Sequence, residues 1–176
     1  MKQRTRARAR LLSQRLVGHG WPSAVDAVRA FGLMQGQETT VFSSIALRNA
    51  GGIDSVAAAL DGHEIVRAYP MRGTVFVALA ADMRWLTELL AKPGVAGALR
   101  NADAAGVSPA RIDAIRDAVL EHGPVNNAQY KAIVARVLDS PEPVNAMVYR
   151  SRYVLLVDGS CAYLGRNQLL GPAPAA

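Results

Sequence analysis

The sequence predicts a mainly α-helical fold with small β wings, an α+β protein made of two winged helix-turn-helix units in tandem. The first observation is the stretch from Ile65 to Leu79, whose two halves are rich in Val, Ile, Tyr and Phe and are joined through 70–73 (PMRG). This pattern is typical of a β-hairpin, and it directly follows two short helical patterns. The second observation is a pair of helical patterns within 108–138 that a Gly-Pro turn separates, which is typical of a helix-turn-helix.

Length and composition restrict the class of protein. A chain of 176 residues that is 51% hydrophobic can bury a core as one domain or as two small ones. No apolar run approaches the roughly 20 residues of a membrane span, so a soluble protein is predicted. The single cysteine, Cys161, excludes an internal disulfide and fits a reducing cytoplasm. The histidines (His19, His63 and His122) lack ligand spacing, so neither a metal site nor a cofactor is expected.

The N-terminal arm carries as much positive charge as the whole chain's excess of +6. Its basic residues all precede the first acidic residue, Asp26; they are Lys2, Arg4, Arg6, Arg8, Arg10 and Arg15. Such an arm can follow a phosphate backbone and release counterions, which predicts salt-dependent DNA binding. The alternatives are a solvated first helix and an amphipathic targeting peptide, although no hydrophobic signal region or small-residue cleavage site follows.

The first unit begins with this arm. Apolar residues at helical spacing predict a half-buried face on its helix, which the breaker residues 18–22 end; they are Leu11, Leu12, Leu16 and Val17. Ser23 is a candidate N-cap, with Asp26 at the capping-box position of a helix that extends to Phe31. Gly32 then ends this helix.

A polar turn over 35–37 (QGQ) leads into two further predicted helices, 41–48 and 54–60. The second of these lies directly before the hairpin, where a winged helix keeps its recognition helix. After the hairpin, Asp82 is a candidate cap for a helix that is broken at 92–94. The inward face of that helix is predicted to hold Trp85, Leu86, Leu89 and Leu90.

The second unit opens with two helices. Ser108, followed by proline, starts the first, and the residues 122–124 close it. Asn126 with Gln129 is a capping-box variant that starts the second. The last stretch, 144–168, fits either a hairpin or a helix followed by a single wing strand.

By analogy with the first unit, the prediction for 144–168 is a helix through Val157 and then one strand. The resulting organisation is a first winged-helix unit, a connecting segment, a second unit and a disordered tail, over 1–91, 92–107, 108–168 and 169–176.

Three segments of the sequence resemble a known bacterial family. They are 32–37 (GLMQGQ), 65–77 (IVRAYPMRGTVFV) and 82–85 (DMRW). In order and spacing they are similar to the winged helix DNA-binding proteins that include the AlkZ and YcaQ type DNA glycosylases, where a Gln-x-Gln motif precedes an extended wing. The similarity covers Arg6 to about Leu90 and continues more weakly beyond. Family members run to about twice this length, so the chain corresponds to about their N-terminal half.

The resemblance implies hydrolysis of the N-glycosidic bond of alkylated bases, with Gln35 and Gln37 as the catalytic pair. An alkylated purine already carries positive charge and leaves readily, so the enzyme must mainly position water and stabilise an oxocarbenium-like sugar. Two amides at i and i+2 of an extended segment point the same way and can orient one water. Glu38 is a candidate for supplementary electrostatic stabilisation. Between the pair, where the family usually has a larger apolar residue, this chain has Gly36.

The predicted partner is double-stranded DNA. The candidate contacts are Arg4, Arg6, Arg8, Arg10, Arg48, Arg67 and Arg72. A non-catalytic DNA-binding module, either a regulator or an accessory protein, would need the same basic residues without the chemistry. A protein-interaction module derived from the family is a third possibility, and the oligomeric state stays open because fold does not determine function.

Overall fold

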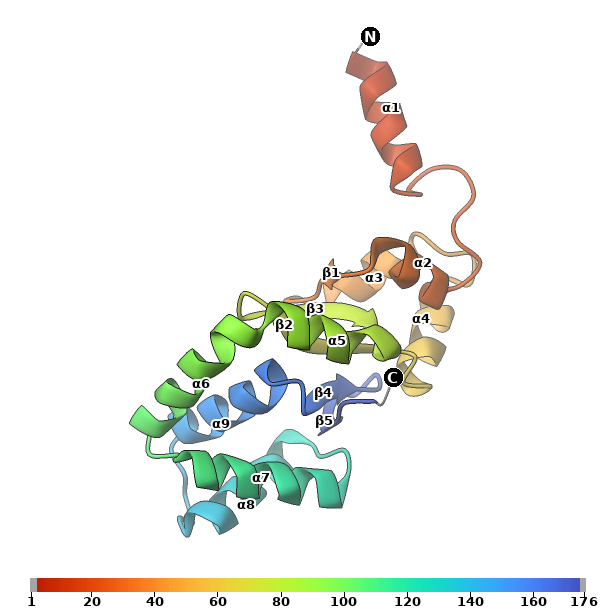
Figure 1. Ribbon diagram of the computed structural model, residues 1–176. Helices are drawn as coiled ribbons and strands as arrows, with labels where there is room; N and C mark the ends of the chain where they lie inside the picture. The colour runs from red at the N-terminus through yellow and green to blue at the C-terminus, as the bar shows by residue number, and fades with distance from the viewer. Residues whose placement is uncertain (1–2, 175–176) are drawn as a thin grey trace.

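Nine helices and five strands form the part of the chain that the computed structural model describes, residues 3–174 (Figure 1). The helices are α1 (Gln3–Ser13), α2 (Ala24–Phe31), α3 (Thr40–Ala46), α4 (Gly52–Asp61), α5 (Ala80–Leu90), α6 (Lys92–Ala104), α7 (Pro109–His122), α8 (Asn127–Leu138) and α9 (Asn145–Val157). The strands are β1 (Met34–Gln35), β2 (Ile65–Met71), β3 (Thr74–Leu79), β4 (Cys161–Leu164) and β5 (Leu169–Pro172). The predicted α+β class is confirmed.

The strands form one antiparallel sheet in the order β1-β3-β2-β4-β5. Its centre is the predicted hairpin, in which Ile65 of β2 pairs with Leu79 of β3 and the turn falls at 72–73. β4 pairs with β2 through Tyr163 and Arg67, so a strand from the second half of the chain extends the hairpin of the first half. The two predicted wings therefore belong to a single sheet.

The two faces of this sheet are covered differently because successive side chains of a strand point to opposite faces. On one face, Val66 and Ala68 of β2 pack against Met83 and Leu86 of α5. The other face is shared between two cores. Near β1 and β3 it is covered by α2, α3 and α4, and near β4 and β5 by the helices of the second half.

Helix starts follow the local sequence closely. Ser23 caps α2, and its side-chain oxygen accepts a hydrogen bond from Asp26 N–H at 3.1 Å. Asn126 and Gln129 form a reciprocal capping box at the start of α8. These predictions are confirmed, since capping depends on residues within one turn of the helix end.

The predicted half-buried face of the N-terminal helix is wrong. α1 contains no buried residue and extends away from the rest of the molecule (Figure 1). Its apolar side chains and those that follow it are 37–46% exposed; they are Leu11, Leu12, Leu16 and Val17. Helical spacing indicates which residues share a face but not whether a partner covers that face. Lys2, another predicted cation of this arm, lies outside the described residues.

The inward face predicted for α5 is also corrected. Leu79, rather than Asp82, is the N-cap, and the carboxylate of Asp82 accepts a hydrogen bond from Trp85 Nε1 at 2.9 Å. Trp85 and Leu89 are exposed, while Met83 and Leu86 are buried. The helix ends at Leu90, and the predicted break at 92–94 is absent because these residues begin α6. The proline lies in the first turn of α6, where a missing N–H costs nothing.

The end of the chain forms a hairpin in place of a single strand and a disordered tail. α9 ends at Val157 as predicted, but β4 pairs with β5 over Cys161↔Pro172 and Leu164↔Leu169. Leu170 also exchanges two backbone hydrogen bonds with Val125, of 2.8 and 2.9 Å. Backbone hydrogen bonds and buried apolar side chains hold this strand. The absence of polar side chains in this segment therefore did not indicate disorder. Residues 175–176 lie outside the described part.

The thiol of Cys161 provides a test of this packing. Cys161 is fully buried, and burial raises its pKa to about 12. We therefore expect a thiol reagent at pH 8 to label the native protein at least about 100-fold more slowly than the urea-unfolded protein, because the thiolate is the reactive form. Labelling followed by mass spectrometry measures both rates, and equal rates would contradict a packed β4.

No helix within residues 3–174 is long and apolar enough to cross a membrane.

Candidate nucleic-acid interface and glutamine pair

The predicted glutamine pair lies at the edge of the sheet. Gln35 ends β1 and pairs with Phe76 of β3, while Gln37 lies in the bend before α3. Both side chains are exposed. Strand geometry does not continue to Gln37, so the alternation expected for i and i+2 does not itself orient the two amides.

Instead, a hydrogen bond from the backbone of β3 orients Gln37. A regular antiparallel ladder would exchange two backbone bonds between Gly36 and Val75. Gly36 N–H donates to Val75 O at 2.8 Å, but Val75 N–H donates to the side-chain Oε1 of Gln37 at 3.3 Å. Because an N–H donor requires the amide oxygen, this bond also determines which way the amide faces. The NH₂ group of Gln37 makes no hydrogen bond to the described residues.

Gly36 is the residue that lets the chain pass this close to β3. It is buried, and an added Cβ would lie 3.1 Å from Val77 Cγ2 and 3.3 Å from Val77 N. A side chain at this position would therefore need Val77 to shift by a few tenths of an ångström. The glycine found in place of a larger apolar residue thus accompanies a close approach of two backbones.

Arg67 lies behind this turn rather than on the surface. Its residue is only 9% exposed, and its Nη2 donates to the carbonyl oxygen of Gly36 at 2.6 Å. Its Nη1 donates to Oε1 of Gln168 at 2.8 Å, and its guanidinium lies 5.8 Å from the ring centre of Phe42. Burial lowers the pKa of Arg67. The prediction that Arg67 contacts phosphate is therefore corrected, because its two terminal nitrogens bind groups inside the protein.

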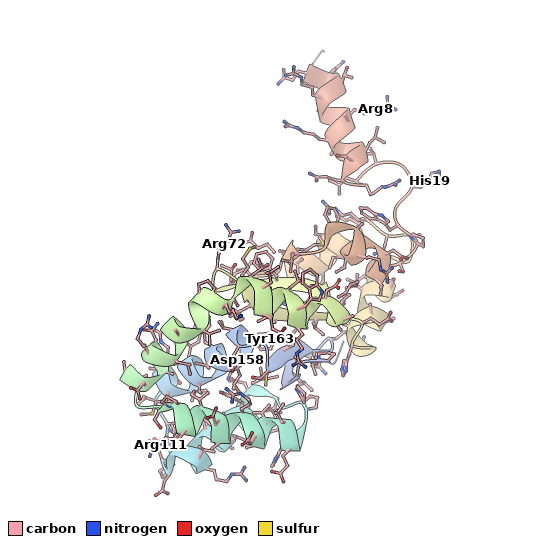
Figure 2. All side chains as sticks on the ribbon, in the orientation of Figure 1. Arg8, His19, Arg72, Arg111, Asp158 and Tyr163 are labelled. Atoms are coloured by element: carbon pink, nitrogen blue, oxygen red, sulfur yellow. The ribbon has the colours of Figure 1, made fainter. Side chains whose placement is uncertain are left out.

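The other predicted DNA contacts differ in their exposure and in their hydrogen bonds within the protein. Arg72 is exposed at the tip of the β2–β3 hairpin with a left-handed backbone (φ 52°) and projects from the molecule (Figure 2). Arg48 is partly buried and folds back onto α3, where Nη1 donates to the carbonyl and the hydroxyl of Ser44, both at 2.7 Å. The predicted contacts in α1 are all exposed; they are Arg4, Arg6, Arg8 and Arg10.

The hairpin tip is close to the glutamines along the sheet. Gln35 pairs with Phe76, which is two residues into β3 from the turn that carries Arg72. At about 3.4 Å per residue, the strand partner of Gln35 lies about 7 Å along β3 from the start of that strand. The glutamine pair and the hairpin tip therefore belong to the same end of β3. Among residues 3–174 no cluster of three or more metal-ligand side chains occurs.

Two contributors to this site could not be found from the sequence. Gln168 precedes β5 and contacts Arg67 across 101 residues of sequence. Val75 takes part through its backbone N–H alone, which any non-proline residue would provide. Neither residue carries a local signal, since each acts on a segment that is distant in the sequence.

Comparison with known proteins identifies the family. A family model described as DNA glycosylase AlkZ-like matches residues 28–159, which is well over half of the chain. The chain belongs to this family. The matched range contains both glutamines, Arg67 and the whole β2–β3 hairpin, whereas α1 lies outside it.

A solved AlkZ-type structure has the same fold. Streptomyces sahachiroi DNA glycosylase AlkZ matches 94% of this AlkZ-like chain with a TM-score of 0.71 and 20% sequence identity. The match covers 47% of that chain, so the present chain spans about half of its length. None of the curated proteins matches the sequence. The shared fold agrees with the predicted resemblance to a shortened AlkZ-type protein.

Proposed function

We propose that this AlkZ-like protein binds double-stranded DNA and hydrolyses the N-glycosidic bond of alkylated bases. The observation that carries the proposal is an exposed pair of glutamines on a restrained sheet edge, beside the β2–β3 hairpin whose tip carries the exposed Arg72. Membership of the AlkZ-like family supports the class of reaction.

The two amides suit different tasks in this reaction. Gln37 Oε1 is bound to Val75 N–H, so its NH₂ group is available to donate to a water or to a sugar oxygen. Gln35 makes no side-chain hydrogen bond within the described residues, so its amide oxygen is available to accept from the same water. A neutral amide cannot remove a proton as a strong base does. The pair therefore acts by orientation.

Orientation is sufficient for a cationic leaving base. In 7-methylguanine the bond between the ring nitrogen and the sugar carbon breaks with its electron pair moving to the base, which neutralises the base's positive charge. Water then forms the new bond to the sugar carbon and loses its proton to solvent. A water held in line with the breaking bond contributes through proximity.

The test is release of 7-methylguanine from methylated duplex DNA by the purified 176-residue protein. Because this base also leaves spontaneously, the rate is compared with the same DNA without protein. Release above that background is the expected result. Binding of DNA with no added release would contradict the catalytic proposal and favour the non-catalytic DNA-binding module.

That module is the second candidate function, and α1 is the observation that favours it. Four exposed arginines on a helix free of acidic residues need only a phosphate backbone as a partner. They do not depend on the glutamine pair.

Arg72→Ala is expected to weaken DNA binding on all sequences and to reduce the slope of log affinity against log salt by about one unit. The physical reason is the loss of one phosphate contact at the hairpin tip. A salt titration followed by fluorescence anisotropy measures the slope. Arg111→Ala, an exposed arginine on α7 at the far end of the molecule (Figure 2), is the matched control. An equal change of slope in both variants would contradict a specific role of Arg72.

A further inference from the structure

Arg67 lies at the seam between the two cores on one face of the sheet. Its β3 neighbour, Val77, belongs to the core of α2, α3 and α4, and its β4 neighbour, Tyr163, packs against the core of the second half. A cation at such a position has lost most of its hydration, which is costly unless protein groups replace it. Three groups partly do so: the carbonyl of Gly36, the amide of Gln168 and the ring of Phe42.

The contacts form a continuous chain from the second half of the molecule to the glutamine pair. Gln168 has a left-handed backbone (φ 52°), and its Nε2 donates to Gly165 O at 2.6 Å, which directs its Oε1 toward Arg67. Arg67, held in this way, donates a hydrogen bond to the carbonyl of Gly36. That carbonyl is the group that a regular ladder would have paired with Val75 N–H.

The bond to Arg67 and the bond to Gln37 lie at the same point of the sheet edge, on Gly36 and on its strand neighbour Val75. The Gly36 carbonyl accepts from Arg67, and Val75 N–H donates to the side chain of Gln37 and not to that carbonyl. Without Arg67, the Gly36 carbonyl loses the bond that restrains it, so the turn that carries Gln37 opens more readily. A planar guanidinium can serve two acceptors in fixed directions at once, which an ammonium group cannot do.

We infer that Arg67, held by Gln168 of the β4–β5 turn, is a positioning residue that holds the Gly36 carbonyl and thereby orients Gln37. Arg67 is not a catalytic residue, because it lies beneath the exposed glutamines. The effect of Arg67 on the rate of base release rests on the proposed glycosylase function. Its effect on the position of the Gly36 carbonyl does not.

The experiment compares Arg67→Met, which keeps the length of the side chain and removes its charge and donors, with Arg111→Met as the control. Amide hydrogen exchange by NMR is measured at Gly36, at Val75 and at the hairpin residues Val66 and Ala78. We expect exchange at Gly36 to accelerate at least about 10-fold in Arg67→Met, since a hydrogen bond to a charged group restrains local opening. Exchange at Val66 and Ala78 should change less than about twofold, because α5 holds that part of the hairpin.

Base release under single-turnover conditions provides the second readout. We expect the rate to fall about 10- to 100-fold in Arg67→Met with DNA affinity nearly unchanged, and Arg67→Lys to fall between Arg67→Met and the wild type. Gln168→Met removes the outer support alone and should accelerate exchange at Gly36 in the same direction by a smaller factor. This variant keeps the test available if Arg67→Met does not fold.

Three outcomes would overturn the inference: unchanged exchange at Gly36, equal acceleration throughout the hairpin, or a loss of DNA affinity equal to the loss of rate. If the wild-type protein releases no base, the proposed function fails by itself. The exchange measurement then still decides whether Arg67 positions this turn.

Discussion

Replacing Gln35 and Gln37 together by alanine is expected to lower the rate of 7-methylguanine release by about 100-fold or more while DNA affinity changes less than about twofold. Truncation removes both amides that can hold the attacking water, but it removes no charge that could attract phosphate. The loss should therefore occur in the rate at saturating protein rather than in binding. Single-turnover release and anisotropy measure the two quantities separately.

The two single variants should differ in a way that follows from their contacts. Gln37→Ala also removes the bond to Val75 N–H, so it should disturb the turn as well as the water, whereas Gln35→Ala leaves the turn intact. Gln3→Ala, at an exposed glutamine at the start of α1, controls for the substitution itself. Equal losses of rate and affinity in the double variant would indicate that the pair binds DNA and does not act in the chemical step.

Replacing the four arginines of α1 by glutamine is expected to have the largest effect on DNA binding. The variant changes Arg4, Arg6, Arg8 and Arg10, all of which are exposed. If each meets one phosphate, the slope of log affinity against log salt should fall by about 3 to 4 units, since each neutralised phosphate contributes about 0.9. At low salt this corresponds to at least about a 100-fold loss of affinity.

The control for this variant must change net charge by the same amount. Four exposed arginines outside α1 meet that requirement; they are Arg84, Arg100, Arg111 and Arg136. If α1 follows the phosphate backbone, only the α1 variant should change the slope strongly. Similar slopes in both variants would show that overall charge attracts DNA and that α1 is a solvated helix.

Local interactions explain which parts of the fold could be predicted. The caps at Ser23 and Asn126 and the hairpin turn at 70–73 depend on residues within a few positions of each other. Predictions failed where a distant segment decides the outcome. Residues 169–172 become a strand because β4 and Val125 supply hydrogen-bond partners, and the apolar face of α1 stays exposed because no described segment covers it.

The same division applies to the site. The sequence by itself determined the family, the α+β class and the exposed glutamines at 35 and 37, since motif order and turn chemistry are local properties. Only the tertiary structure decided that Arg67 faces inward. In β2 the direction of a side chain depends on which face of the sheet its position occupies, and its partners Gly36 and Gln168 come from opposite ends of the chain. Charge alone cannot distinguish an arginine that meets phosphate from one that holds a backbone carbonyl, because burial depends on contacts that only the folded chain brings together.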